Sequence, residues 1–179
     1  MSAGRQFPPI VLIGMMGAGK STIGRALAEL LRLSFVDLDR ELERRCGVSI
    51  PCIFDAEGED GFRKRETELL KEYLGKPNTI IATGGGVVVK LENRELIKQS
   101  QALSVHLTIL PEQCYERTRM SDRPLLQCEN PLETIRFLIK TRTPYYQEVA
   151  ALTYSTDGKT VQEGAVELAE QIQKRLTER

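Results

Sequence analysis

The chain of 179 residues contains no tryptophan and only one histidine, His106, and its four cysteines form no Cys-x-x-Cys pair. Zinc sites and haem attachment need cysteines and histidines in short-spaced sets, so the sequence argues against both. His106 lies in an alternating Ser-Val-His-Leu-Thr run. We therefore expect it to be a structural residue of a strand rather than a ligand.

Long apolar runs and an excess of one charge are also missing. No run approaches the roughly 18 apolar residues of a membrane span, and the first nine residues lack the charged start and apolar core of a signal peptide. Lysines plus arginines number 25, as do aspartates plus glutamates, so no overall field attracts nucleic acid or anionic membranes. We expect one cytoplasmic domain over residues 1–179, a monomer with no nucleic-acid or membrane partner.

The stretch 10–31, IVLIGMMGAGKSTIGRALAELL, is the most informative part of the chain. An apolar run predicts a buried strand, and the later apolar residues return at helical spacing. Between them, residues 14–21 match G-x-x-x-x-G-K-[ST], the phosphate-binding P-loop. Lys20 can reach the β- and γ-phosphates of a nucleotide, and the Ser21 hydroxyl can bind Mg²⁺. The predicted ATP-binding residues of this stretch are Gly17, Ala18, Gly19, Lys20, Ser21 and Thr22.

Further strands are predicted near 34–39, 79–83, 102–109 and 151–155. Between and after them, helical patterns are expected at 40–46, from Ser49, at 60–74, at 91–99, from Pro111, from Pro131 to about residues 142–146, and at 161–176. Strands that alternate with helices in this way are typical of a parallel, doubly wound α/β sheet.

Two carboxylates, Asp37 and Asp39, lie at the end of the second predicted strand. Open parallel sheets bind ligands at the carboxyl ends of their strands. We expect Asp37 to bind a water molecule of the magnesium ion, and Asp39 to orient an acceptor hydroxyl and take its proton. The pattern equally allows Asp39 simply to cap the following helix.

Several arginines indicate an anionic acceptor. Arg63 and Glu66 are three residues apart on a predicted helix and share a face, while Arg142 lies near the end of another helix. Guanidinium groups bind carboxylate or phosphate in a bidentate way. The three glycines 84–86 after a buried strand indicate a close approach of the backbone, and the alternative is a merely flexible turn. The arginine-rich, aperiodic stretch after Arg117 predicts a lid, from which Arg123 closes over the γ-phosphate.

The ordered motifs GMMGAGKSTIGRALA, FVDLD, GVSIPCIFDAEGEDGFRKRE, TGGGVV, RPLL and RTPYY resemble bacterial shikimate kinases from about Val11 to Ala150. The resemblance implies ATP-dependent phosphorylation of the 3-hydroxyl of shikimate, a step in chorismate and aromatic amino-acid biosynthesis. It also implies a three-layer, nucleoside-monophosphate-kinase-like fold with a five-stranded parallel sheet. A shikimate-binding segment would then cover about residues 38–66, and a mobile lid residues 118–130.

The same resemblance assigns roles to single residues. By this resemblance, Asp39 binds the hydroxyls of shikimate, and Arg63 and Arg142 bind its carboxylate. The backbone of Gly84, Gly85 and Gly86 also contacts shikimate. The supporting roles are Glu66 for orienting Arg63, Asp37 for the magnesium side, Arg123 for the phosphates, and Arg117 for stacking on adenine. Arg119 is an alternative for the adenine role, and a second adenine-side loop is expected near residues 155–160.

Two other functions share parts of this pattern. A P-loop kinase for another small acceptor, such as gluconate, needs residues 14–21 but not Arg63, Glu66 and the RPLL segment together. A non-catalytic nucleotide-binding module would keep the fold, yet no predicted catalytic residue is missing from the sequence.

Overall fold

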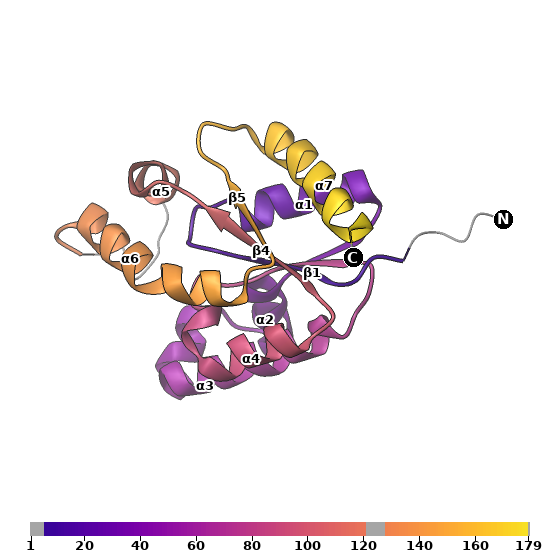
Figure 1. The fold of residues 1–179 in the computed structure, drawn as a ribbon. Coiled ribbons are helices and arrows are strands. Elements are labelled where there is room, and N and C mark those ends of the chain that lie inside the picture. Colours follow the sequence, from indigo (N-terminus) through magenta and orange to yellow (C-terminus); the bar gives the residue numbers. More distant parts are fainter. Residues whose placement is uncertain (1–5, 121–127, 179) are drawn as a thin grey trace.

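The computed structural model describes residues 6–120 and 128–178, and it is built around a parallel sheet with helices on both faces (Figure 1). The sheet has the order β2-β3-β1-β4-β5, and every neighbouring pair is parallel. Its strands are β1 (Ile10–Ile13), β2 (Ser34–Asp37), β3 (Thr79–Ala82), β4 (Leu103–Thr108) and β5 (Leu152–Ser155). The predicted five-stranded α/β fold is confirmed.

The helices connect the strands and cover the sheet in two layers. In the described chain they are α1 (Lys20–Leu31), α2 (Leu38–Cys46), α3 (Ile50–Leu74), the 3-10 helix η1 (Val87–Val89), α4 (Leu91–Gln99), α5 (Pro111–Thr118), α6 (Pro131–Val149) and α7 (Val161–Thr177). Helices α1 and α7 pack together over one face, while α2, α3 and α4 lie over the other (Figure 1).

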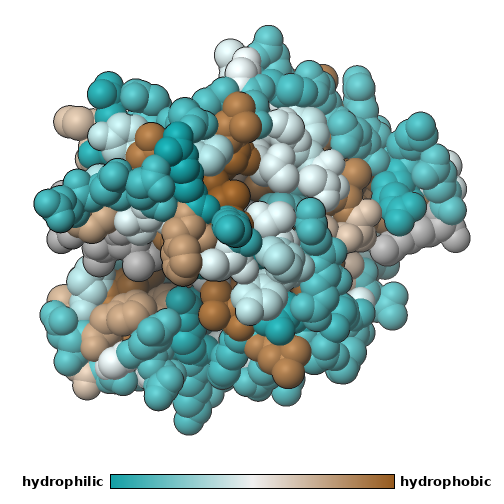
Figure 2. Space-filling model, turned by 60° about the vertical axis from the view of Figure 1, so that its left-hand side comes forward, coloured by the Kyte–Doolittle hydropathy of each residue, from teal (hydrophilic) through white to brown (hydrophobic). Residues whose placement is uncertain are grey.

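The central strands explain the apolar runs of the sequence. Every residue of β1 and β3 is buried, whereas the edge strands β2 and β5 are only partly buried. Strands covered on both faces carry continuous rather than alternating apolar residues. Because β1 is the middle strand, the loop that follows it lies at the centre of the carboxyl edge of the sheet. That edge faces the left of Figure 1, and Figure 2 shows a largely hydrophilic surface there, with hydrophobic residues gathered toward its middle.

The predicted strand 34–39 was too long, since β2 ends at Asp37 and α2 already begins at Leu38, and two further helices differ from the predicted bounds. Helix α3 continues from Ile50 to Leu74, but Gly58, with φ 70° and ψ −176°, separates two helical pieces. Helix α6 was expected to end near residues 142–146, and this was wrong, since it continues through Pro144 to Val149. The buried side chains of Tyr146 and Val149 lie beyond the proline, and their packing outweighs the lost backbone hydrogen bond.

The predicted lid lies only partly within the described structure. Residues 121–127, including Arg123, are outside the described residues, so the predictions about them stay predictions. Among the described helices, none is long and apolar enough to span a bilayer.

Candidate active site

The P-loop turns directly at the end of β1. Gly14, Gly17 and Gly19 have φ values of 141°, 75° and 90°, a region that favours glycine. A Cβ at Gly14 would lie 2.3 Å from the carbonyl oxygen of Leu107, so no larger residue fits there. Gly19 is the N-cap of α1, which places the positive end of that helix beneath the loop.

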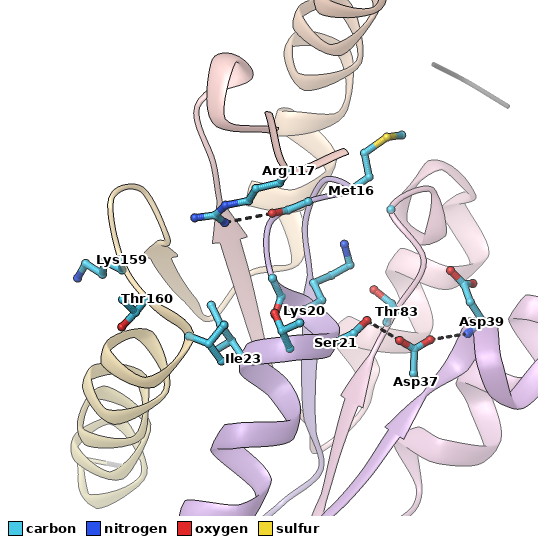
Figure 3. A pocket seen from close by; sticks show the side chains of 15 residues that line it. Met16, Lys20, Ser21, Ile23, Asp37, Asp39, Thr83, Arg117, Lys159 and Thr160 are labelled. Atoms are coloured by element: carbon cyan, nitrogen blue, oxygen red, sulfur yellow. Dashed lines mark hydrogen bonds between the residues drawn. The ribbon is translucent and has the colours of Figure 1, made fainter. Parts of the chain in front are cut away.

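A cavity of about 480 Å³ opens over this loop (Figure 3). Its lining contains the P-loop, the end of β2, the start of α2, the end of β3 and the start of α7. The lining residues are Met16, Gly17, Gly19, Lys20, Ser21, Thr22, Ile23, Asp37, Asp39, Thr83, Gly85, Arg117, Lys159, Thr160 and Val161. The cavity therefore joins the predicted nucleotide residues to two predicted acceptor residues, Asp39 and Gly85, while Arg63 and Arg142 lie outside its lining.

Lys20 and Ser21 make defined contacts inside the site. The Lys20 ammonium donates to the carbonyl oxygens of Gly14 and Met15, at 2.7 and 2.8 Å, and its side chain is buried. The Ser21 hydroxyl donates to Oδ2 of Asp37 at 2.5 Å (Figure 3). The two residues predicted for the magnesium side therefore touch each other.

Asp37, and not Asp39, caps helix α2. Oδ1 of Asp37 accepts the backbone N–H groups of Asp39 and Arg40, at 3.1 and 3.3 Å. The alternative that Asp39 is the helix cap is therefore wrong. Asp39 lies in the first turn of the helix, and its carboxylate faces Gly84, at the border between the two halves of the site.

The triple glycine is surrounded by the predicted acceptor residues. A Cβ at Gly84 would lie 3.0 Å from Oδ1 of Asp39 and 3.1 Å from Oε1 of Glu66. At Gly86 it would lie only 2.5 Å from Nη2 of Arg63.

Gly85 makes the remaining close approaches of this segment. A Cβ there would lie 3.3 Å from the backbone nitrogen of Met16 and 3.8 Å from Nη1 of Arg142. The glycines thus allow α2, α3, α6 and the P-loop to converge on one point.

Arg63 contacts two carboxylates and an aromatic ring, and its Nε lies 3.5 Å from Oε1 of the exposed Glu59. Its guanidinium bonds Oε2 of Glu66 at 2.8 Å, which confirms the predicted pair, and it lies over the Phe62 ring at 5.1 Å. Phe62 in turn packs on Phe54, with ring centroids 4.7 Å apart. Burial raises the pKa of Glu66, and the charge of Arg63 opposes this rise.

On the opposite side of the cavity, Arg117 links the P-loop to the loop after β5. Its guanidinium donates to the carbonyl oxygen of Gly17 at 3.1 Å and to the carbonyl oxygen of Thr156 at 3.0 Å. Arg119 pairs instead with Glu116, and its side chain is 54% exposed. Of the two arginines considered for adenine, only Arg117 lines the cavity.

Some neighbours of the site carry no recognisable sequence signal. The thiol of Cys114 donates to the carbonyl oxygen of Met16 at 3.0 Å. The hydroxyl of Tyr146 donates to the carbonyl oxygen of Gly85 at 2.5 Å. His106 is buried in β4 and stacks on Tyr146, which confirms its structural role. A single cysteine or tyrosine at a helical position does not indicate such contacts, because they depend on tertiary packing.

The residues that could hold a metal are few. Within the described ranges, no group of three or more histidine, cysteine, aspartate or glutamate side chains forms a metal site. Ser21 and Asp37 offer a hydroxyl and a carboxylate beside the P-loop. This small set of oxygen ligands fits Mg²⁺, which binds nucleotide phosphates with only one or two protein groups.

Known proteins resemble this chain in sequence and in fold. The chain is 49% identical over 149 residues to a shikimate kinase of Bordetella pertussis, covering 83% of this chain and 70% of that protein. The structure of Acinetobacter baumannii shikimate kinase in complex with shikimate superimposes with a TM-score of 0.89 at 44% identity, covering 94% of both chains. A gluconokinase from Sinorhizobium meliloti, at 17% identity and a TM-score of 0.57 over 96% of this chain and 99% of that one, shares the fold. The family model for shikimate kinase matches residues 16–173, and the chain therefore belongs to the shikimate kinase family.

Proposed function

We propose that this protein transfers the γ-phosphoryl group of ATP to the 3-hydroxyl of shikimate, a step of chorismate and aromatic amino-acid biosynthesis. One observation carries the proposal. The triple glycine brings Asp39, Arg63 and Arg142 together, and Gly85 in the same segment approaches the P-loop backbone. A carboxylate for a hydroxyl and two guanidinium groups for a carboxylate therefore lie beside the phosphate site, as an acidic, hydroxylated acceptor requires.

On the nucleotide side, the backbone N–H groups of residues 17–22 and the start of α1 bind the phosphates of ATP. Lys20, which donates to two P-loop carbonyls in this structure, contacts the transferring phosphoryl group when ATP is bound. Ser21 would hold Mg²⁺ directly and Asp37 through water, and the bound ion would neutralise charge on the phosphates. The hydrogen bond between Ser21 and Asp37 supports this pairing.

On the acceptor side, Arg63 and Arg142 bind the shikimate carboxylate, and Glu66 orients Arg63. Asp39 accepts a hydrogen bond from the acceptor hydroxyl and takes its proton as the new oxygen–phosphorus bond forms. The bond between the γ-phosphorus and the bridging oxygen breaks, and ADP leaves. Arg123 closes over the γ-phosphate from the lid, and Arg117 packs against adenine, with its position beside Gly17 and Thr156 in support.

We further propose a cytoplasmic monomer that has small molecules as its only substrates. The four cysteines, which are all free thiols, support a reducing compartment. The balanced charge of the sequence gives no general attraction to nucleic acid or anionic membranes.

The decisive experiment measures ADP release from ATP and Mg²⁺ with shikimate, gluconate, AMP or no acceptor. We expect release with shikimate alone, together with a phosphorylated 3-hydroxyl detected by phosphorus NMR. Release with gluconate would keep the P-loop assignment and overturn the roles of Arg63 and Arg142. No release with any acceptor would favour a nucleotide-binding module without catalytic activity.

A further inference from the structure

Tyr146 connects the triple glycine to the helix that carries Arg142. Its hydroxyl donates to the carbonyl oxygen of Gly85 at 2.5 Å, and only 1% of the residue is exposed. Tyr146 follows Arg142 by four residues on α6, so both side chains project from the same face of the helix. Burial raises the pKa of Tyr146 to about 12, and the nearby positive charge of Arg142 opposes the rise, so the phenol stays a hydrogen-bond donor at neutral pH.

This bond fixes the orientation of one peptide unit in the acceptor pocket. In a trans peptide the C=O and the following N–H point in opposite directions. Tyr146 binds the carbonyl of Gly85, so the N–H of Gly86 must point away from α6. Glycine has wide backbone freedom, and a run of three would otherwise allow this peptide to rotate.

The tyrosine ring packs against a residue of β4. It stacks on His106, with ring centroids 4.8 Å apart and an interplanar angle of 26°. Burial, and secondarily the charge of Lys20, lower the pKa of His106 to about 4, so its ring is neutral at neutral pH. A neutral, buried ring gives Tyr146 a fixed platform without adding charge to the site.

We propose that Tyr146 is a positioning residue for the acceptor: its hydroxyl sets Gly85 relative to Arg142, so that backbone and guanidinium present one preformed site for the acceptor carboxylate. The inference depends on the proposed function, because it assumes that shikimate occupies this pocket. It predicts a specific defect in acceptor binding rather than a general loss of stability.

Tyr146→Phe removes only the hydroxyl and keeps the stacked ring. We expect the KM for shikimate to rise about three- to tenfold, as the loss of one hydrogen bond implies, while the KM for ATP changes less than about twofold. The matched control is Tyr154→Phe, since Tyr154 is also buried, in the edge strand β5, and its hydroxyl bonds Glu167 of α7 at 2.9 Å instead of the triple glycine. The control should lower the unfolding temperature without changing the KM for shikimate.

A second variant keeps the test decisive if Tyr146→Phe does not fold. His106→Leu fills the space beneath the tyrosine but removes the flat ring, and it should shift the KM for shikimate in the same direction. An unchanged KM for shikimate in a folded Tyr146→Phe, or equal increases in Tyr146→Phe and Tyr154→Phe, would overturn the inference. If the wild-type protein does not phosphorylate shikimate, the proposed function itself fails, and wild-type activity therefore separates the two failures.

Discussion

The phosphate-binding part of the site comes from one continuous stretch, residues 14–21, whereas the acceptor side collects side chains from α2, α3 and α6 around the triple glycine. The P-loop acts mainly through its backbone, which three glycines bend into shape. The acceptor pocket acts mainly through charged side chains, whose positions depend on how three helices pack. A local motif therefore specifies the first half, and tertiary structure specifies the second.

This difference separates the expected effects of substitutions. A change in the P-loop should affect every reaction of the protein, because the transferring phosphoryl group is held there. A change around the triple glycine should affect one substrate and leave the other bound. Substitutions of Lys20, Arg63, Gly86 and Glu66 test this division.

The largest effect is expected for Lys20→Ala. Because Lys20 is assigned to the transferring phosphoryl group, its removal should lower kcat about a thousandfold or more while the protein stays folded. Turnover with shikimate and a circular dichroism melt provide the measurement. Lys76→Ala is the control, since Lys76 pairs with Glu72 on the surface, lies over the Tyr73 ring and does not line the cavity, so kcat should stay unchanged. Near-normal turnover of Lys20→Ala would refute the P-loop assignment.

Arg63→Ala should separate the two substrates. Loss of a guanidinium that binds the acceptor carboxylate should raise the dissociation constant for shikimate roughly ten- to a hundredfold and leave that for ATP nearly unchanged. Isothermal titration with each ligand measures both values. Arg65→Ala is a matched control two residues away, because Arg65 pairs with Glu57 on the surface. Equal losses for both ligands would argue against the assigned role.

The sequence predicted the P-loop and the sheet because their signals are local: an eight-residue motif and apolar runs at strand spacing. It could not decide whether Asp39 serves the acceptor or only caps the following helix, and it did not indicate Asp37 as the cap, since β2 passes into α2 without a linker. Pro144 indicated a helix end that packing overrides. Helical spacing predicted the pairing of Arg63 with Glu66. The proximity of this pair to Asp39 and Arg142 depends on long-range packing, which no short motif encodes.

Gly86→Ala should produce a smaller and equally selective defect. The new Cβ would lie 2.5 Å from Nη2 of Arg63, at the movable end of a long side chain, so the fold should survive while Arg63 is displaced. We expect the KM for shikimate to rise roughly three- to tenfold with an unchanged unfolding temperature.

The control for this variant is Gly75→Ala. Gly75 has a φ of −88°. Outside its two chain neighbours, the nearest atom to a Cβ at this position would be the carbonyl oxygen of Glu72, at 3.5 Å. Alanine fits there, so both the KM for shikimate and the stability should stay near wild type. If Gly86→Ala also left the KM unchanged, the position of the Arg63 guanidinium would not matter for acceptor binding.

The smallest effect concerns Glu66, where function and stability should move in opposite directions. Burial raises the pKa of Glu66 above 4.5, so the folded chain holds this proton more tightly than the unfolded chain. The free energy of unfolding should therefore fall as the pH rises from about 4.5 through the folded pKa. Glu66→Gln removes this titration and should unfold at neutral pH at an equal or higher denaturant concentration than wild type.

The same Glu66→Gln variant should bind shikimate about two- to fivefold more weakly, because an amide oxygen holds the Arg63 guanidinium less firmly than a carboxylate. Glu72→Gln is the opposite case, since Arg45, and then Lys76, lower the pKa of Glu72 to about 2. That carboxylate stabilises the fold above pH 4.5 and loses this effect as the pH falls toward 2, so its variant should lose stability at neutral pH and keep shikimate affinity. Denaturant unfolding at pH 4 and 7 with shikimate titrations tests both. If Glu66→Gln destabilised the fold at pH 7 as Glu72→Gln does, the buried carboxylate would be a stabilising group and not one retained for orienting Arg63.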